Sequence, residues 1–110
     1  GRKPELRFRF IQENAARLGE FLLAELRALK RRFPFLGDVR GRGLMIGLDF
    51  GDPDHPQPDL RDKAVRLAFE KGLLLLPAGP SALRIAPPLV LTQEEAALGL
   101  EILEEVFRAL

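Results

Sequence analysis

The 110-residue sequence contains no cysteine, no tryptophan and no tyrosine, and it has one histidine and one methionine. Without cysteine the chain can form no disulfide and offers no thiolate to a metal, and on this ground we expect a cytoplasmic protein. Eight phenylalanines are its only aromatic residues, which leaves few platforms for stacking nucleic-acid bases. No apolar run approaches the roughly 20 residues of a membrane-spanning helix. We therefore expect neither a membrane nor a nucleic acid as a partner.

The formal net charge is only +1, but the charges are unevenly distributed along the sequence. Residues 1–42 hold 11 Lys and Arg against 5 Asp and Glu, whereas residues 43–110 hold 6 against 11. A basic half is one feature of nucleic-acid-binding proteins, and this class remains a minor alternative. The basic residues are scattered, however, and fit the solvated face of a helix better. At 46% hydrophobic residues, the chain is long enough for one domain with one core.

The spacing of apolar residues predicts three helices. The first runs from about residue 11 to 31, because its leucines and other apolar residues recur every three or four positions. The second is expected to begin with Asp59 as its N-cap residue and to end before Gly72, which suits the left-handed position after a helix. The third begins after Thr92, which forms a capping box with Glu95.

Three short strands are predicted between these helices. One is centred on residues 44–48 within the segment 39–50, and the others lie at 73–76 and 83–86. The proline-rich segment 51–58 is expected to be a loop and residues 77–80 a turn. The order helix, strand, helix, strand, strand, helix predicts an α+β two-layer sandwich, in which the helices cover one face of a small, mostly antiparallel sheet of about three strands.

Two motifs carry little functional signal. The glycine cluster at residues 41–47 precedes a strand, whereas a dinucleotide-binding loop follows a strand and precedes a helix. The same stretch places Leu44 and Ile46 where an RNA-recognition strand needs aromatic rings. His55 is the only histidine, and no second imidazole or thiolate exists to complete a common zinc site. We predict no metal site and no catalytic residue in this chain.

Arg84 is the strongest candidate for a functional residue. It stands in an apolar run that reads as a buried or half-buried strand, where a lone arginine is costly unless an anion meets it. Its planar guanidinium suits a carboxylate held through two parallel hydrogen bonds. From the residues alone two alternatives stay open, namely a structural pair with an acidic residue of the core and the binding of a ligand carboxylate.

Five segments match, in order and spacing, a pattern known from one enzyme family. They are residues 13–19 (ENAARLG), 37–47 (GDVRGRGLMIG), 70–77 (EKGLLLLP), 83–89 (LRIAPPL) and the final helix from Thr92. Residues 11–110 thereby resemble the C-terminal small domain of class III (fold type I) pyridoxal-phosphate-dependent aminotransferases, which include the 4-aminobutyrate, ornithine and acetylornithine aminotransferases. Residues 1–10 do not resemble the family and are expected to be an N-terminal extension.

The resemblance implies a role for Arg84, which would grip a carboxylate of the amino-acid or 2-oxo-acid substrate. It also implies that Pro77, Gly79 and Pro80 lie near the substrate entrance. In the full-length enzymes the cofactor pyridoxal phosphate, its lysine and most phosphate contacts belong to a large preceding domain, which this chain lacks. No lysine here matches the cofactor-lysine motif, so we do not expect this chain alone to bind the cofactor or to be active.

Two functions are therefore in competition. In the first, the chain is a C-terminal domain fragment of an aminotransferase and contributes substrate-carboxylate binding through Arg84. Its expected partners are the missing large domain and a second copy, since the parent enzymes are expected to be homodimers. In the alternative, it is a stand-alone α+β binding or oligomerisation module without catalysis, which associates through an exposed apolar patch.

Overall fold

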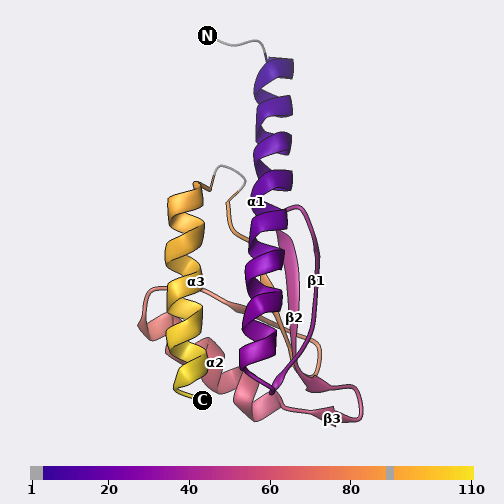
Figure 1. Cartoon of the computed structure of the whole chain (residues 1–110), viewed down its shortest axis with the longest axis vertical. Coiled ribbons are helices and arrows are strands. Elements are labelled where there is room, and N and C mark those ends of the chain that lie inside the picture. The colour runs from indigo at the N-terminus through magenta and orange to yellow at the C-terminus, as the bar shows by residue number, and fades with distance from the viewer. Residues whose placement is uncertain (1–3, 89–90) are drawn as a thin grey trace.

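The computed structural model describes residues 4–88 and 91–110, which form three helices and five strands (Figure 1). In chain order the elements are α1 (Pro4–Arg32), β1 (Leu36–Arg42), β2 (Met45–Asp52), β3 (His55–Pro56), α2 (Pro58–Glu70), β4 (Leu76–Ala78), β5 (Ala82–Ile85) and α3 (Gln93–Arg108). The predicted α+β class is confirmed. Within the described residues, no helix combines the length and the apolar character that crossing a membrane requires.

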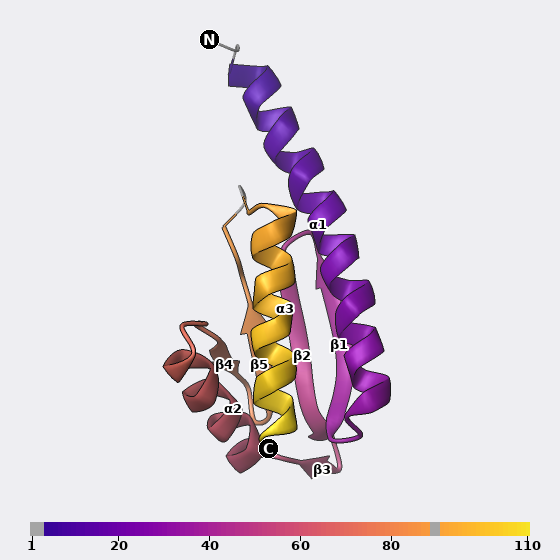
Figure 2. The same ribbon diagram turned by 60° about the vertical axis from the view of Figure 1, so that its left-hand side comes forward.

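The strands form one antiparallel sheet in the order β1-β2-β5-β4, and β3 pairs with the end of β2. Helices α1 and α3 lie across one face of the sheet, and α2 lies beside α3 near β4 (Figure 2). Along β2, Ile46, Leu48 and Phe50 are buried against the helices, while the intervening residues point to the opposite face. No helix of the described part covers that face, so the sheet has one buried and one open side, as a two-layer sandwich requires.

The sheet has two more strands than predicted. Residues 39–50 contain a hairpin instead of a single strand, because Gly43 adopts a φ of +58° at the first position of a two-residue turn between β1 and β2. A short strand, β3, forms inside the segment predicted as a proline-rich loop. Strand β4 starts at Leu76 instead of residue 73, because the N–H of Leu73 still bonds to the carbonyl of Ala68 and closes the end of α2.

The predicted helix ends are partly right. Helix α1 begins at Pro4, seven residues before its predicted start. Helix α2 begins at Pro58 after Gln57, whose side chain makes no capping hydrogen bond, so Asp59 lies in the first turn and is not the N-cap residue. Gly72 follows α2 with a φ of +88°, which confirms its left-handed position.

The capping box of α3 is confirmed in both directions. The backbone N–H of Glu95 donates to Oγ1 of Thr92 at 3.1 Å, and the backbone N–H of Thr92 donates to the Glu95 carboxylate at 3.0 Å. These bonds satisfy two backbone donors that the first turn of a helix otherwise leaves without a partner. The start of α3 is therefore specified by residues that are only three positions apart.

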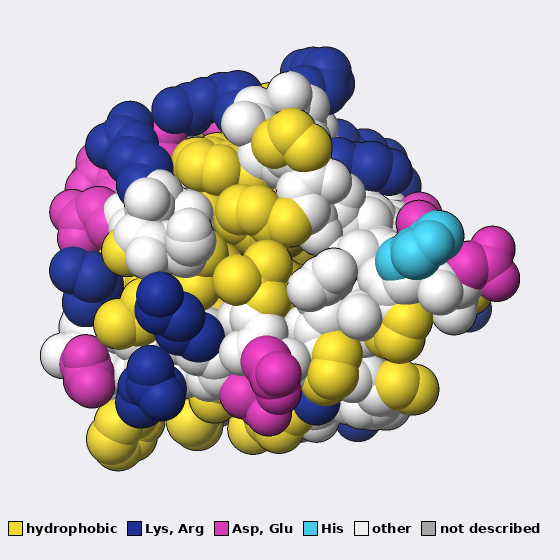
Figure 3. Space-filling model, turned by 90° about the horizontal axis from the view of Figure 1, so that it is seen from below, with side chains coloured by type: hydrophobic (Ala, Val, Ile, Leu, Met, Phe, Trp, Pro, Cys, Tyr) yellow, Lys and Arg dark blue, Asp and Glu magenta, His cyan; other side chains and the backbone are white. Residues whose placement is uncertain are grey.

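The core lies between the helices and the covered face of the sheet. Its lower end holds a cluster of four phenylalanines, in which the centroids of contacting rings lie 5.8–6.1 Å apart, namely Phe33, Phe35, Phe50 and Phe107. Phe50 and Phe107 are almost fully buried, whereas Phe33 and Phe35 are only partly buried. Figure 3, which views this end of the molecule, shows hydrophobic side chains at the surface with charged groups around them. The cluster joins both layers, because its rings come from the sheet, from α3 and from the segment after α1.

Candidate functional site

Arg84 lies in β5 and points to the open face of the sheet. Side chains alternate along a strand, and here Leu83 is buried against the helices while Arg84 is exposed. The predicted half-buried strand is therefore right, and Arg84 lies on its uncovered side, where water solvates the guanidinium and no buried acid is required. Within residues 4–88 and 91–110 the structure shows no hydrogen bond and no ion pair to its guanidinium. The described residues thus supply no acidic partner for it, and its donors are available to an anion from elsewhere.

The surroundings of Arg84 form a shallow depression of about 240 Å³. Its cross-strand neighbours are Gly47 on β2 and Leu76 on β4. Gly47 in turn pairs with Arg40 on β1, so the two arginines lie on the same face of the sheet with Gly47 between them. Since Gly47 has no side chain, the guanidinium of Arg40 lies over it, and a Cβ atom at position 47 would be 3.4 Å from Cζ of Arg40.

Arg40 differs from Arg84 because acidic groups already hold it. Its Nη1 lies 3.0 Å from a carboxylate oxygen of Asp49 and 3.4 Å from one of Asp38. The hydrogen bond and the charge of Asp49 raise the pKa of Arg40, with a smaller contribution from Asp38. Arg42, which pairs with Met45, is a third arginine on this face but does not line the depression. Of the two arginines that line it, only Arg84 therefore offers an uncompensated positive charge.

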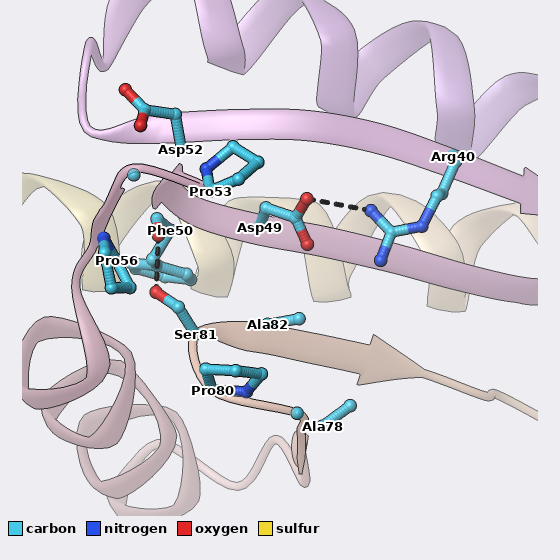
Figure 4. Close-up of a pocket in the computed structure, with 12 residues that line it drawn as sticks. Arg40, Asp49, Phe50, Asp52, Pro53, Pro56, Ala78, Pro80, Ser81 and Ala82 are labelled. Carbon is cyan, nitrogen blue, oxygen red and sulfur yellow. Dashed lines mark hydrogen bonds and ion pairs between the residues drawn. The ribbon is translucent and has the colours of Figure 1, made fainter.

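A larger cleft, of about 440 Å³, lies between the end of β2 and the β4–β5 turn (Figure 4). On one wall, Arg40 and Asp49 point toward one another, and on the other the Ser81 hydroxyl donates to the carbonyl of Phe50. The carboxylate of Asp52 accepts hydrogen bonds from the backbone N–H groups of residues 54 and 55. Arg40 and Asp49 balance one another, and the carboxylate of Asp52 remains exposed, so the cleft adds a negative charge and no unpaired cation beside Arg84.

The turn that borders this cleft carries the residues predicted near a substrate entrance. Pro77 lies in β4 opposite Leu83, and Gly79 and Pro80 form the tip of the turn, where Gly79 has a φ of +54°. All three predicted residues are exposed. Gly79 and Pro80 line the cleft, whereas Pro77 lies on the side of the sheet that Leu83 faces, opposite to Arg84.

His55 and its neighbours provide no metal centre. The imidazole is 80% exposed and its Nδ1 lies 3.2 Å from a carboxylate oxygen of Asp52. The backbone N–H of His55 is the main reason why the pKa of Asp52 is lowered. Within the part of the chain that the structure describes, no three histidine or acidic side chains come together as metal ligands.

The three lysines of the described residues lie away from Arg84. Lys30 and Lys63 are exposed on α1 and α2, and Lys71 lies 3.3 Å from a carboxylate oxygen of Glu105. None of these three lines the depression or the cleft beside Arg84. Lys3 lies outside the described residues. A lysine that serves as covalent partner to an aldehyde cofactor needs an enclosed position beside it, and the described lysines do not have one.

Arg61 is a feature that sequence reasoning missed. It lies on α2, is 8% exposed, and its guanidinium reaches the backbone of the β4–β5 turn. The spacing of Arg61, Ala64 and Ala68 places the three residues on one face of the helix, which could have indicated that Arg61 is buried. In the structure this face is the buried one. A charged residue on the inner face of a helix indicates a buried polar contact.

Comparison with known proteins gives consistent matches over most of the chain. A family model described as aminotransferase class-III matches residues 5–107. Among curated proteins, the alanine/serine racemase of Pyrococcus horikoshii is 43% identical in an alignment of 99 residues that covers 87% of this chain and 21% of the racemase. The 4-aminobutyrate aminotransferase of Escherichia coli is 42% identical in an alignment of 107 residues that covers 89% of this chain and 25% of the aminotransferase.

Solved structures agree with the sequence matches. A phospholyase from Arthrobacter, in complex with phosphoethanolamine, superimposes with a TM-score of 0.88 at 30% identity, over 96% of this chain and 26% of the phospholyase. An acetylornithine aminotransferase from Elizabethkingia anophelis gives a TM-score of 0.86 at 27% identity, over 96% and 27% of the two chains. The present chain spans about a fifth to a quarter of the length of the curated relatives it matches.

Proposed function

Because this chain belongs to the class III aminotransferase family, we propose that it is the C-terminal small domain of an enzyme that transfers an amino group between an amino acid or amine and a 2-oxo acid. Its contribution is to bind the carboxylate of the substrate through Arg84. The observation that carries this proposal is the position of Arg84, which is exposed on the open sheet face with no anion bound to it among the described residues.

The chemistry of the guanidinium supports this role. Arginine keeps its charge at any physiological pH and presents two parallel N–H donors that match the two oxygens of a carboxylate. Such a pair is weak in water and becomes much stronger when the surroundings exclude water. The open sheet face alone does not exclude water, so we expect the remaining part of the enzyme to cover it and to complete the site.

The names of the relatives are consistent with a carboxylate ligand. The alanine/serine racemase, the 4-aminobutyrate aminotransferase and the acetylornithine aminotransferases are named for amino acids, each of which carries a carboxylate. These proteins differ in the reaction that their names describe. Carboxylate binding is therefore a role that a shared domain can keep while the reaction changes.

Membership of the family implies pyridoxal phosphate in the full-length enzymes. We assign the cofactor and its lysine to the remaining part of the protein, since the described lysines of this chain are exposed or paired with an acid. Bound there, the cofactor supplies the electron sink for amino-group transfer. The role of this chain is to hold the substrate carboxylate while that chemistry takes place.

The β4–β5 turn with Pro77, Gly79 and Pro80 forms the rim of the substrate entrance in this proposal. The turn is exposed and lies beside the cleft of about 440 Å³ on the same face as Arg84. Two prolines and the neighbouring β-hairpin limit its conformational freedom. A rim of this kind restricts the approach of the substrate without contributing charge.

The alternative of a stand-alone binding or oligomerisation module is not favoured by the family match. We expect the exposed apolar residues of the chain, which include Met45 and Leu76 on the open face, to contact the large domain. We also propose a homodimer for the complete enzyme. Sedimentation of the complete enzyme and of the 110-residue chain measures the oligomeric state of each, and the comparison shows whether the homodimer requires the large domain.

The test of the proposed function is an Arg84→Gln substitution in the complete enzyme that contains this chain. Truncating one partner of a desolvated ion pair costs about 2–5 kcal/mol, so the KM for the 2-oxo acid is expected to rise at least tens of times. Arg84→Lys keeps the positive charge but loses the two parallel N–H donors of the guanidinium, so a KM between those of the wild type and Arg84→Gln is expected. Arg66→Gln, which changes an exposed arginine of α2, is the matched control. An unchanged KM in Arg84→Gln contradicts the proposal.

The cofactor assignment has a separate test on the 110-residue chain. Pyridoxal phosphate is added, any lysine adduct is fixed with borohydride, and the modified lysine is mapped by mass spectrometry. We expect no stoichiometric adduct at a single lysine. One saturable adduct at one lysine would place a cofactor site in this chain and contradict the assignment.

A further inference from the structure

Arg61 is the only buried charged residue in the described part of the chain. From α2 its guanidinium reaches across to the β4–β5 turn and donates to four backbone carbonyls. Nη1 lies 2.9 Å from the carbonyl of Ala82, 3.2 Å from that of Gly79 and 3.3 Å from that of Ala78, and Nη2 lies 3.4 Å from that of Pro80. One side chain therefore binds almost the whole backbone of the turn.

This arrangement also satisfies Arg61 itself. Its Nε donates to the carboxylate of Asp62 at 2.7 Å, which supplies the opposite charge. A buried cation is costly unless its donors are engaged, and here the three guanidinium nitrogens each have an acceptor. Hydrogen bonds from a charged donor are stronger than those between neutral groups. The turn is thus held by a set of contacts that a neutral side chain cannot provide.

Ser81 holds the same turn from the other side. Its hydroxyl donates to the carbonyl of Phe50 in β2 and accepts the backbone N–H of Gln57 at 2.7 Å. The backbone of Ser81 also accepts the N–H of Phe50 at 2.8 Å. The turn is therefore fixed between β2 on one side and α2 on the other, and Arg61 supplies the α2 side.

The position of the turn determines the position of Arg84. The carbonyl of Ala82, which makes the shortest contact to Arg61, lies two residues before Arg84 in β5. The turn also sets the register of the hairpin, in which Ala78 pairs with Ala82 and Leu76 with Arg84. A slip of one residue would turn Arg84 to the covered face of the sheet.

We propose that Arg61 is a positioning residue for substrate-carboxylate binding. It fixes the β4–β5 turn and thereby sets the place of Arg84, without contacting the substrate. This inference rests on the proposed function of Arg84. It predicts that the two arginines are energetically coupled although the structure shows no contact between them.

The test uses Arg61→Met in the complete enzyme that contains this chain. Small displacements of a binding group reduce kcat/KM by about 10- to 100-fold, and we expect most of this loss as a higher KM for the 2-oxo acid, since Arg61 touches no reacting atom. Arg61→Lys keeps a buried cation that can bind some of the carbonyls, so a smaller rise in KM is expected. Arg66→Met, on the same helix but exposed, should leave KM unchanged.

A double-mutant cycle with Arg84→Gln separates positioning from general stability. If Arg61 acts through Arg84, Arg61→Met raises KM in the wild-type background and has little effect in the Arg84→Gln background. If Arg61→Met raises KM by the same factor in both backgrounds, the positioning role is overturned, while the proposed function of Arg84 is unaffected. If Arg84→Gln alone leaves KM unchanged, both proposals fail. Should Arg61→Met not fold, Arg61→Lys is used in the same cycle, and a wild-type KM in that variant overturns the inference.

Discussion

Gly19 of α1 lies directly against the backbone carbonyl of Gly43 in the β1–β2 turn. A Cβ atom built on Gly19 would overlap that carbonyl oxygen, which belongs to the backbone and cannot rotate away. The helix therefore approaches the turn more closely than any other residue at position 19 would allow. This contact joins α1 to the β1–β2 hairpin, which carries both Arg40 and Gly47 of the open face.

We predict that Gly19→Ala destabilises the chain by about 1–3 kcal/mol, the range for overpacking a well-packed site. Urea denaturation of the 110-residue chain, followed by circular dichroism, measures the change. Gly99→Ala is the matched control, because nothing lies within 4 Å of a Cβ at Gly99 in α3. This control should stabilise the chain by up to about 1 kcal/mol, since alanine favours a helix over glycine. Equal effects of the two substitutions would contradict the role of Gly19.

A second prediction concerns the phenylalanine cluster. Phe107 is 1% exposed and contacts the rings of Phe50 in β2 and of Phe35 just before β1, whereas Phe69 on α2 is 69% exposed. Phe107→Ala is expected to cost about 3–5 kcal/mol, because it removes buried apolar surface and leaves a cavity. Phe69→Ala is expected to change stability by less than about 0.5 kcal/mol. Thermal unfolding of the two variants tests this difference, and similar melting temperatures would contradict it.

The capping box of α3 gives a third prediction. Removing the side chain of Thr92 by Thr92→Ala is expected to cost about 1 kcal/mol, the usual effect of losing an N-cap side chain. Denaturation in urea at neutral pH measures this loss. Thr92→Ser keeps the hydroxyl and should retain most of the stability. A Thr92→Ser variant as unstable as Thr92→Ala would show that the methyl group, and not the hydroxyl, matters.

The same capping box predicts a pH dependence. Hydrogen bonds from the backbone and side chain of Thr92 lower the pKa of Glu95 below its ordinary value of 4.5. The ionised form therefore stabilises the folded state, fully above pH 4.5, and this contribution is lost as the pH falls through the lowered pKa. The stability of the wild type relative to Glu95→Gln should decrease over that range. Glu94→Gln changes the neighbouring carboxylate and serves as control. A difference that does not vary with pH would contradict the prediction.

The parts of the fold that sequence alone predicts are those set by neighbouring residues. Thr92 and Glu95 are three positions apart, and Gly72 needs only the helix that precedes it, so their structures follow from local chemistry. The β1–β2 hairpin was missed because Gly43, which forms its turn, is one of several glycines in the segment 37–47. No local feature indicates which of those glycines adopts a positive φ.

In the candidate site, too, local features could be predicted and features that depend on the tertiary fold could not. Arg84 could be selected from the sequence because a lone arginine in an apolar run is unusual. The exposure of Arg84 could not be predicted, because it depends on which face of the sheet the helices cover. The burial of Arg61 depends on carbonyls 17 to 21 positions further along the chain. Contacts over such distances are decided by the tertiary fold and have only a weak signature in the spacing of α2.

The last prediction concerns Gly47, which separates Arg40 from Arg84 on the open face. A Cβ at this position would lie 3.4 Å from the guanidinium carbon of Arg40, which is ordinary van der Waals contact. Gly47→Ala and Gly47→Val should therefore fold, and valine suits a strand. Both substitutions add bulk under the guanidinium of Arg40, on the strand that pairs with Arg84. If the substrate carboxylate lies there, the KM for the 2-oxo acid in the complete enzyme should rise from glycine to alanine to valine.

The size of the side chain makes this prediction specific. An added methyl or isopropyl group changes neither the charge nor the hydrogen bonds of Arg84, so an effect on KM reports the bulk added at position 47, including any displacement of the neighbouring Arg40. Folding is checked by urea denaturation of each variant. A folded Gly47→Val enzyme with wild-type KM would mean that the carboxylate approaches Arg84 from the side of β4, where Leu76 is its cross-strand neighbour. Leu76→Ala, which opens that side, would then be the variant expected to change KM.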